Sequence, residues 1–163
     1  FKDAAEAYRT AIKLDESNAD SQYALGLTLG KLNRTDEEIL AYKRAVALKP
    51  DHANAIEKLG LAYFKQKRYA DALQSFEQLK TYKPDGRTYN YLGESYFELG
   101  KTTDALEAFN NAVNFNPDFE RARFNLGKTH LKLGDRDSAA IQYEMLRNAK
   151  SDWADRLYVL LNP

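Results

Sequence analysis

Histidine and cysteine, two residue types that often act as metal ligands and in catalysis, are rare in this 163-residue sequence. The chain has two histidines and no cysteine, which excludes thiolate nucleophiles, disulfides and cysteine–metal sites. His52 and His130 lie far apart in the sequence, and neither belongs to a pair with metal-ligand spacing. Asp135-Arg136-Asp137 has the form of a short acidic metal motif. It falls between two expected helices, so we expect it to cap a helix instead.

Other short motifs also fail to indicate a reaction. The sequence has no glycine-rich phosphate loop. Asn33-Arg34-Thr35 fits the glycosylation pattern, which is short enough to occur often by chance. Gly26 and Gly30 have the spacing of a membrane-helix dimer motif, but the segment around them is too polar and too short for a membrane. We therefore expect no catalytic residue, no metal and no cofactor.

The elements that position the side chains recur at a nearly constant interval. The glycines of four Leu-Gly pairs are 34, 33 and 34 residues apart: Leu25-Gly26, Leu59-Gly60, Leu92-Gly93 and Leu126-Gly127. An aromatic column follows the same interval: Tyr8, Tyr42, Phe76, Phe109 and Tyr143. Self-similarity at this period predicts stacked supersecondary units and not a single globular core.

Each period contains two segments with helical periodicity. In residues 53–84, apolar side chains follow the three-then-four spacing of one helix face, first from Ile56 to Tyr63 and then from Tyr69 to Leu79. Pro84 should end the second helix, because proline lacks the amide hydrogen. The aspartates just ahead of the first helices are predicted N-caps: Asp51, Asp85, Asp118 and Asp152.

Small residues recur where neighbouring helices should approach closely. A glycine inside a helix costs about 1 kcal/mol relative to alanine, so four glycines at one phase indicate that an aromatic side chain needs the space. The aromatic column of the second helices is the expected occupant. A second small column comprises Ala4, Ala72, Ala105 and Ala139, and Glu38 interrupts it.

These columns resemble the tetratricopeptide repeat over nearly the whole chain. The resemblance rests on the Leu-Gly pair, the small residue midway, the aromatic residue four positions later, and the closing prolines Pro50, Pro84 and Pro117. Glu16 and Ser151 depart from it at the proline position, and His130 stands in an aromatic core column. The resemblance implies an all-α, right-handed superhelical solenoid of antiparallel helix pairs.

The expected array comprises 163 residues in one domain. Residues 1–18 match the second helix of a truncated repeat, and the full repeats are expected at 19–52, 53–85, 86–119 and 120–153. Residues 154–163 are expected to form a C-terminal capping helix; a further repeat cut short is the alternative. The first helix should leave an uncovered apolar face, which predicts either continuation upstream or contact with another molecule.

Composition limits the classes of partner. Lys plus Arg equals Asp plus Glu at 24 each, which argues against a nucleic-acid binder that acts through bulk phosphate attraction. No apolar stretch approaches the length of a membrane span. Nothing in the sequence indicates a compartment, and a cytoplasmic location is only the default expectation.

The resemblance implies that the first helices line a concave groove. Counting from the core columns gives the predicted partner-binding residues: Tyr23, Leu27, Asn54, Lys58, Leu61, Phe64, Arg87, Asn90, Tyr91, Glu94, Arg121, Phe124, Asn125 and Lys128. Exposed apolar groups in such a groove would mark an interaction site. The alternative is that Phe64, Phe97 and Leu131 pack partly against neighbouring helices and that the charged groups are only solvated.

Three functions follow from this sequence. The first is a non-catalytic scaffold that binds a peptide or partner protein in the groove. The second is a targeting or regulatory segment of a larger enzyme, and the third is self-assembly through the uncovered first helix. The carboxylate clamp of chaperone-tail binders within the family needs lysines and asparagines at set positions of the repeats, and this sequence mostly has other residues there. Tight binding of such a tail is therefore not expected.

Overall fold

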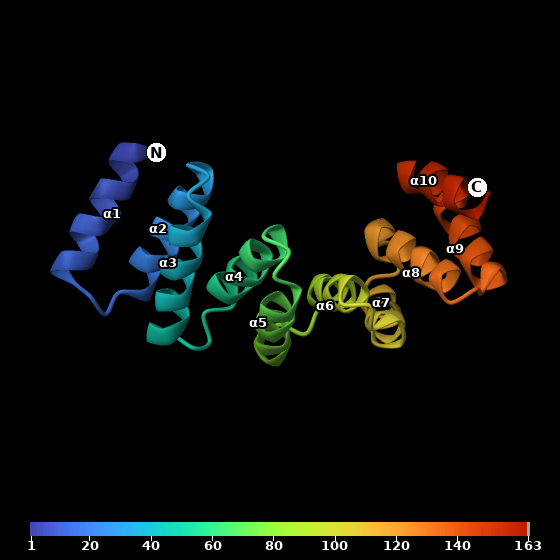
Figure 1. Cartoon of the computed structure of the whole chain (residues 1–163), viewed down its shortest axis with the longest axis horizontal. Coiled ribbons are helices and arrows are strands. Elements are labelled where there is room, and N and C mark those ends of the chain that lie inside the picture. The colour runs from blue at the N-terminus through green and yellow to red at the C-terminus, as the bar shows by residue number, and fades with distance from the viewer. Residues whose placement is uncertain (163) are drawn as a thin grey trace. The chain divides into compact units, whose positions relative to one another are not determined.

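The computed structural model describes residues 1–162, and every regular element within them is an α-helix. The expected all-α fold is therefore confirmed. The chain forms two compact units, one of residues 1–82 and one that begins at residue 83. Figure 1 shows the helices of each unit coloured along the chain. None of the described helices combines the length and the apolar character needed to cross a membrane.

The first unit contains five helices. They are α1 (Lys2–Leu14), α2 (Ala19–Lys31), α3 (Thr35–Leu48), α4 (Ala53–Lys65) and α5 (Tyr69–Tyr82). The pairs α2–α3 and α4–α5 pack most extensively, while α1 packs on α2 and α3 packs on α4. Each helix therefore contacts its neighbours in chain order.

The second unit also contains five helices. They are α6 (Gly86–Glu98), α7 (Thr102–Phe115), α8 (Glu120–Lys132), α9 (Arg136–Asn148) and α10 (Asp152–Leu161). The pairs α6–α7 and α8–α9 pack in the same way as those of the first unit, and α10 packs on both α8 and α9. Leu157 and Leu161 of α10 are buried there, whereas Leu160 is exposed.

Three of the periodic glycines confirm the predicted aromatic sockets. A Cβ atom added at Gly26, Gly60 or Gly93 would lie 2.5 Å from a ring carbon of Tyr42, Phe76 or Phe109, respectively. These rings are almost completely buried. Glycine is therefore required at these positions because a ring of the paired helix fills the space of a side chain.

The fourth glycine differs from the expectation. The atom nearest to a Cβ added at Gly127 is Cδ2 of Leu157, at 2.6 Å, and not an atom of Tyr143. Leu157 belongs to α10, which packs against α8 and takes the space that a ring occupies in the preceding pairs. Tyr143 instead lies beside Tyr158, with 5.7 Å between the ring centroids.

At three of the four helices with a predicted N-cap, the observed N-cap is a different residue. Asp85 caps α6 by accepting from the Thr88 amide, as expected. The caps of α4, α8 and α10 are instead His52, Phe119 and Ser151, each one residue away from the predicted aspartate. The predictions of Asp51, Asp118 and Asp152 are therefore wrong. The capping role expected for Asp135 is confirmed, because its side chain accepts from the Ser138 amide at 3.0 Å.

The same type of turn joins the two helices in each of four helix pairs. The residue at the centre of this turn has a positive φ: Asn33, Lys67, Gly100 and Gly134. In each turn the next amide donates to a carbonyl five residues earlier, as in Arg68 to Tyr63 at 3.0 Å. This is the hydrogen-bond pattern of the left-handed helix ending that favours glycine. Lys67 therefore adopts a backbone conformation that is unfavourable for its side chain.

Candidate functional site

All the predicted partner-binding residues lie on the first helices of the pairs. Tyr23 and Leu27 are on α2, and four more are on α4, all in the first unit. The others lie on α6 and α8 of the second unit. The structure thus brings the predicted residues together as two sets, one in each unit.

A polar network joins four of the predicted residues across α6 and α8. The Asn125 side-chain amide donates to Asn90 Oδ1 at 3.0 Å and to Glu94 Oε1 at 2.9 Å. Asn90 donates in turn to Glu94 Oε1 at 3.0 Å. The two asparagines are buried, at 0% and 7% exposed. Buried amides with hydrogen-bond partners fix the positions of the groups around them.

Arg121 adds a charged group to this network. Its Nη2 lies 2.8 Å from Glu94 Oε1 and 2.9 Å from Oε2. The Glu94 side chain is only 13% exposed, whereas that of Arg121 is 48% exposed. Because the contacts to Glu94 use one nitrogen of the guanidinium, the remaining N–H groups of Arg121 are available to an incoming acceptor.

Phe97 lies beneath two cations on the same surface. The Nζ atoms of Lys128 and Lys132 lie 4.1 and 4.2 Å from its ring centroid. The ring itself packs on the buried cluster that contains Phe109 and Leu126. The partial packing stated as the alternative for Phe97 is therefore observed. One predicted binding residue, Lys128, lies over the ring in a cation–π contact.

Phe124 packs against a residue outside the predicted set. Its ring centroid lies 4.9 Å from that of Trp153, and the Arg156 guanidinium lies 4.5 Å from the Trp153 ring centroid. Both aromatic residues are partly buried on the cluster around Leu157. The repeat columns did not reveal Trp153 because it lies on α10, where the periodic pattern stops.

In the first unit, the Tyr23 ring lies beside the start of α4. It is 5.0 Å from the His52 ring and 6.0 Å from the Tyr42 ring. His52 Nδ1 accepts from the Ala55 amide, and its Nε2 lies 3.1 Å from Asp20 Oδ1. These contacts assign the proton to Nε2, which donates to the carboxylate. Burial, and then the charge of Glu57, raise the pKa of the Tyr23 phenol.

Glu38 is a charged residue of this unit that interrupts the small-residue column. Burial raises the pKa of its carboxyl group, while the charges of Lys65 and Lys58 and a hydrogen bond with Tyr42 act in the opposite direction. The carboxylate fits because Gly30 has no side chain: a Cβ atom there would lie 2.6 Å from Glu38 Oε1. This pairing of Glu38 with Gly30 was not predicted from either column alone.

The remaining predicted residues have varied surroundings. The Phe64 ring lies edge-on to the Tyr69 ring, with 5.1 Å between the ring centroids. This is the partial packing stated as the alternative. Leu131 likewise packs on a buried cluster. Leu27, Asn54 and Arg87 are exposed, while Leu61 and Tyr91 are partly buried. No group of three side chains suited to hold a metal ion occurs among residues 1–162.

Comparisons with known proteins identify the family. A family model described as "TPR repeat" matches residues 1–33 and 93–134, and one described as "Anaphase-promoting complex, cyclosome, subunit 3" matches residues 31–112. The chain belongs to the tetratricopeptide repeat family. The resemblance seen in the Leu-Gly and aromatic columns is thus confirmed. No curated protein matches the sequence.

Several solved tetratricopeptide repeat structures are similar to this chain. A MamA structure is 26% identical with a TM-score of 0.84 and covers 90% of this chain and 81% of that one. MamA from Desulfovibrio magneticus RS-1 is 22% identical with a TM-score of 0.85, covering 93% and 86%. YrrB, described as a TPR protein with an unusual peptide-binding site, is 24% identical with a TM-score of 0.78, covering 96% and 84%. These similarities support the same solenoid fold.

Proposed function

We propose that this chain is a non-catalytic interaction module that binds a peptide segment of a partner protein on the surfaces formed by its first helices. The observation that carries the proposal is the network of Asn90, Glu94, Arg121 and Asn125. It holds a half-exposed guanidinium in a fixed position on a surface with aromatic groups. Arginine and tyrosine are the residue types enriched at binding hot spots.

The geometry of the α6–α8 surface favours a peptide ligand. Arg121 retains donors for a carboxylate or a peptide carbonyl, and Lys128 is a second cation on the same helix. The buried asparagines hydrogen-bond Glu94, the partner of Arg121. This reduces the loss of side-chain freedom on binding, because the network already orders the groups. The surface therefore suits a segment with acceptor groups and one or more apolar side chains.

The test uses peptides selected from a random library for binding to the 163-residue chain. We expect Arg121→Ala to weaken their binding by about tenfold, the effect of losing a contact worth about 1.4 kcal/mol. Arg147→Ala is the matched control, because Arg147, like Arg121, is an exposed arginine paired with a glutamate; its partner, Glu144, lies on the same helix, α9. Equal binding by both variants and the wild type would place the binding surface elsewhere.

Self-association through α1 is a second candidate function. Phe1, Tyr8 and Leu14 are 71%, 36% and 85% exposed, and apolar groups of this size favour contact with another surface. Sedimentation velocity over a range of concentrations tests this candidate. We expect the mass to rise with concentration, and to stop rising in Tyr8→Ser/Leu14→Ser; a monomer at all concentrations would remove the candidate.

A further inference from the structure

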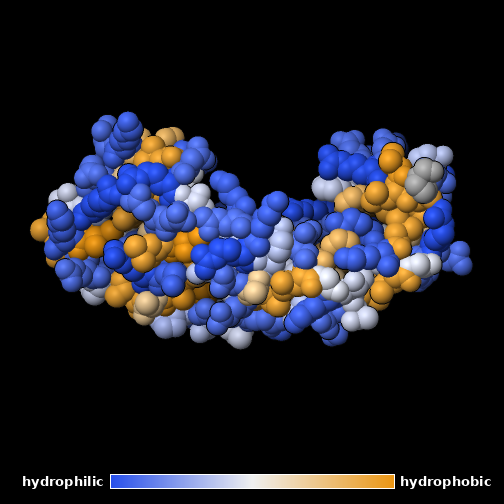
Figure 2. All heavy atoms as spheres, in the orientation of Figure 1, coloured by the Kyte–Doolittle hydropathy of each residue, from blue (hydrophilic) through white to orange (hydrophobic). Residues whose placement is uncertain are grey.

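A groove lies between α1 and α3, on a surface that the predicted partner-binding residues do not form. One cavity in it, of about 290 Å³, is lined by side chains of α1, α2 and α3, among them Ile12, Gln22, Leu25 and Leu40. A second cavity, of about 440 Å³, shares Ile12 and Gln22 with the first and extends toward Leu48. The two cavities therefore form one continuous groove. Over the α1–α3 end of the chain, Figure 2 shows apolar side chains among hydrophilic ones.

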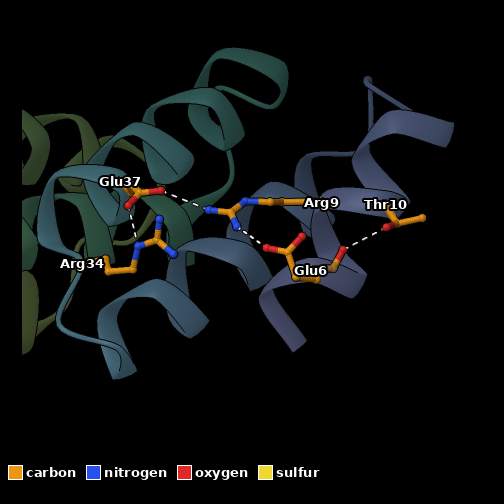
Figure 3. Close-up of polar contacts among 5 residues, drawn as sticks. All are labelled: Glu6, Arg9, Thr10, Arg34 and Glu37. Carbon is orange, nitrogen blue, oxygen red and sulfur yellow. Dashed lines mark hydrogen bonds and ion pairs between the residues drawn. The ribbon is translucent and has the colours of Figure 1, made fainter. Parts of the chain in front are cut away.

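An ion pair connects the two walls of the groove. Arg9 of α1 lies 2.5 Å from Glu6 on its own helix and 3.1 Å from Glu37 of α3. Glu37 also accepts from Arg34 Nε at 2.5 Å. Figure 3 shows this chain of contacts running from α1 to α3. Since its charges are already paired with one another, this end of the groove has little attraction for a charged ligand.

The other part of the groove has unpaired positive charge. Lys13 of α1 and Arg44 of α3 line both cavities and are exposed. Within residues 1–162 neither side chain makes an ion pair or a hydrogen bond. Glu16 is the single acidic residue that lines the larger cavity. The walls therefore present two free cations beside apolar side chains, which is complementary to an acidic, apolar ligand.

Gln22 supplies the observation that distinguishes among acidic ligands. Its side chain is 4% exposed, lines both cavities, and has a buried Oε1 with no hydrogen-bond partner. A buried polar atom without a partner is rare in folded proteins and destabilises them. A primary amide offers both a donor and an acceptor, which match the carbonyl and the N–H of a peptide bond. An extended segment presents these backbone groups, whereas a helix already pairs its own.

We propose that the groove between α1 and α3 binds an extended acidic segment of a partner protein. Alternate side chains of an extended segment point to opposite sides. Apolar side chains would then pack on Ile12, Leu25 and Leu40, while carboxylates pair with Lys13 and Arg44. The backbone of the segment hydrogen-bonds the Gln22 amide. This surface is separate from the proposed α6–α8 site, so the chain would contact partners through two surfaces.

The experiment measures the fluorescence anisotropy of two labelled peptides with the 163-residue chain. One peptide alternates leucine with aspartate, and the other alternates leucine with lysine. We expect the aspartate peptide to bind and the lysine peptide not to bind. Lys13→Glu/Arg44→Glu should weaken the aspartate peptide by more than about tenfold, since two charge-assisted contacts are lost, and should allow binding of the lysine peptide. Lys43→Glu, an exposed charge reversal outside the groove lining, is the matched control.

Further variants separate recognition from folding. Gln22→Met replaces the unpaired amide with an apolar side chain of similar length, so we expect a higher melting temperature together with weaker peptide binding. Arg44→Gln, with less disturbance of charge, should weaken binding while circular dichroism stays unchanged. Arg121→Ala should leave this binding intact, which separates the groove from the proposed function.

Defined results would overturn the proposal. These are failure of the aspartate peptide to bind, equal loss of binding in Lys43→Glu, or unchanged binding in Gln22→Met. Vesicles containing phosphatidylserine provide the remaining comparison. If they bind in a manner that depends on Lys13 and Arg44 while the aspartate peptide does not, the groove recognises a lipid surface and the peptide assignment is wrong.

Discussion

The substitution Gly93→Ala tests the glycine–aromatic packing most directly. The added methyl carbon would lie 2.5 Å from Phe109 Cε1, 2.6 Å from Cδ1 and 2.9 Å from Cγ. Favourable contacts between carbon atoms begin at about 3.5 Å, so the overlap involves one whole edge of the ring. Phe109 is 1% exposed and packs on Ala105 and Leu126. The ring therefore has little space into which it can move.

Two opposing effects determine how much Gly93→Ala changes the free energy of unfolding. Alanine favours the helix by about 1 kcal/mol over glycine. Overpacking a buried site costs about 1–3 kcal/mol, and a rigid ring enclosed on all sides places this site near the upper end. We therefore expect Gly93→Ala to lower the free energy of unfolding by about 1–2 kcal/mol.

Urea denaturation monitored by the fluorescence of Trp153 measures this change. Trp153 is the single tryptophan of the sequence and lies in the same unit as Gly93. Phe109→Leu should recover part of the loss in the Gly93→Ala background, giving a favourable coupling in the double-mutant cycle. In the control Gly30→Ala the new methyl group meets the carboxylate end of Glu38, which can move into solvent. A Gly93→Ala variant as stable as the wild type would refute the packing argument.

Three further substitutions test other features. Lys67→Gly should raise the free energy of unfolding by about 1 kcal/mol, because Lys67 has a φ of 59°; no gain in thermal denaturation would contradict the turn geometry. His52→Ala should destabilise the first unit by about 1 kcal/mol through loss of the α4 cap, whereas His52→Asn should keep most of the wild-type stability, because asparagine can also cap a helix; equal melting temperatures for the two variants would count against the capping role. Burial raises the pKa of Glu38, so its ionised form opposes folding, and Glu38→Gln should stabilise the chain at pH 7. The penalty develops as pH rises from the ordinary pKa of 4.5 through the higher folded value, so this gain should vanish well below pH 4.5; a gain independent of pH would disprove the electrostatic cause.

The fold was predictable because its signals repeat. Close helix packing is indicated where a glycine is followed about sixteen positions later by an aromatic residue. The structure shows this contact at Gly26, Gly60 and Gly93, as expected. The prediction failed at Gly127, where Leu157 of α10 takes the place of the ring. A residue outside the repeating columns leaves no periodic signal in the sequence.

The helix starts show a different limit. A proline followed by aspartate locates a helix start to within a residue or two, but the exact cap depends on how the chain turns into the helix. At α4 the cap is the imidazole of His52, whose Nδ1 can accept an amide hydrogen as an aspartate does. Residue-type preferences alone ranked Asp51 above it.

The candidate site was predictable as a helix face and not as a set of contacts. Periodicity placed Asn90, Glu94, Arg121 and Asn125 on one surface, because residues three or four apart share a helix face. It did not indicate that Asn125 donates to two acceptors on α6 or that both asparagines are buried. Those contacts depend on side-chain rotamers and on the distance between helices.

The nearest-neighbour packing of the helices has a consequence for synthesis on the ribosome. Within each unit the extensive contacts join helices that are adjacent or next but one in chain order, as in α2 with α3 or α10 with α8. Contacts between segments close in sequence form quickly, since little chain entropy is lost in bringing them together. The earlier helix pairs can therefore reach their native packing while later residues are still being translated, which shortens the time that the aromatic side chains remain exposed to aggregation.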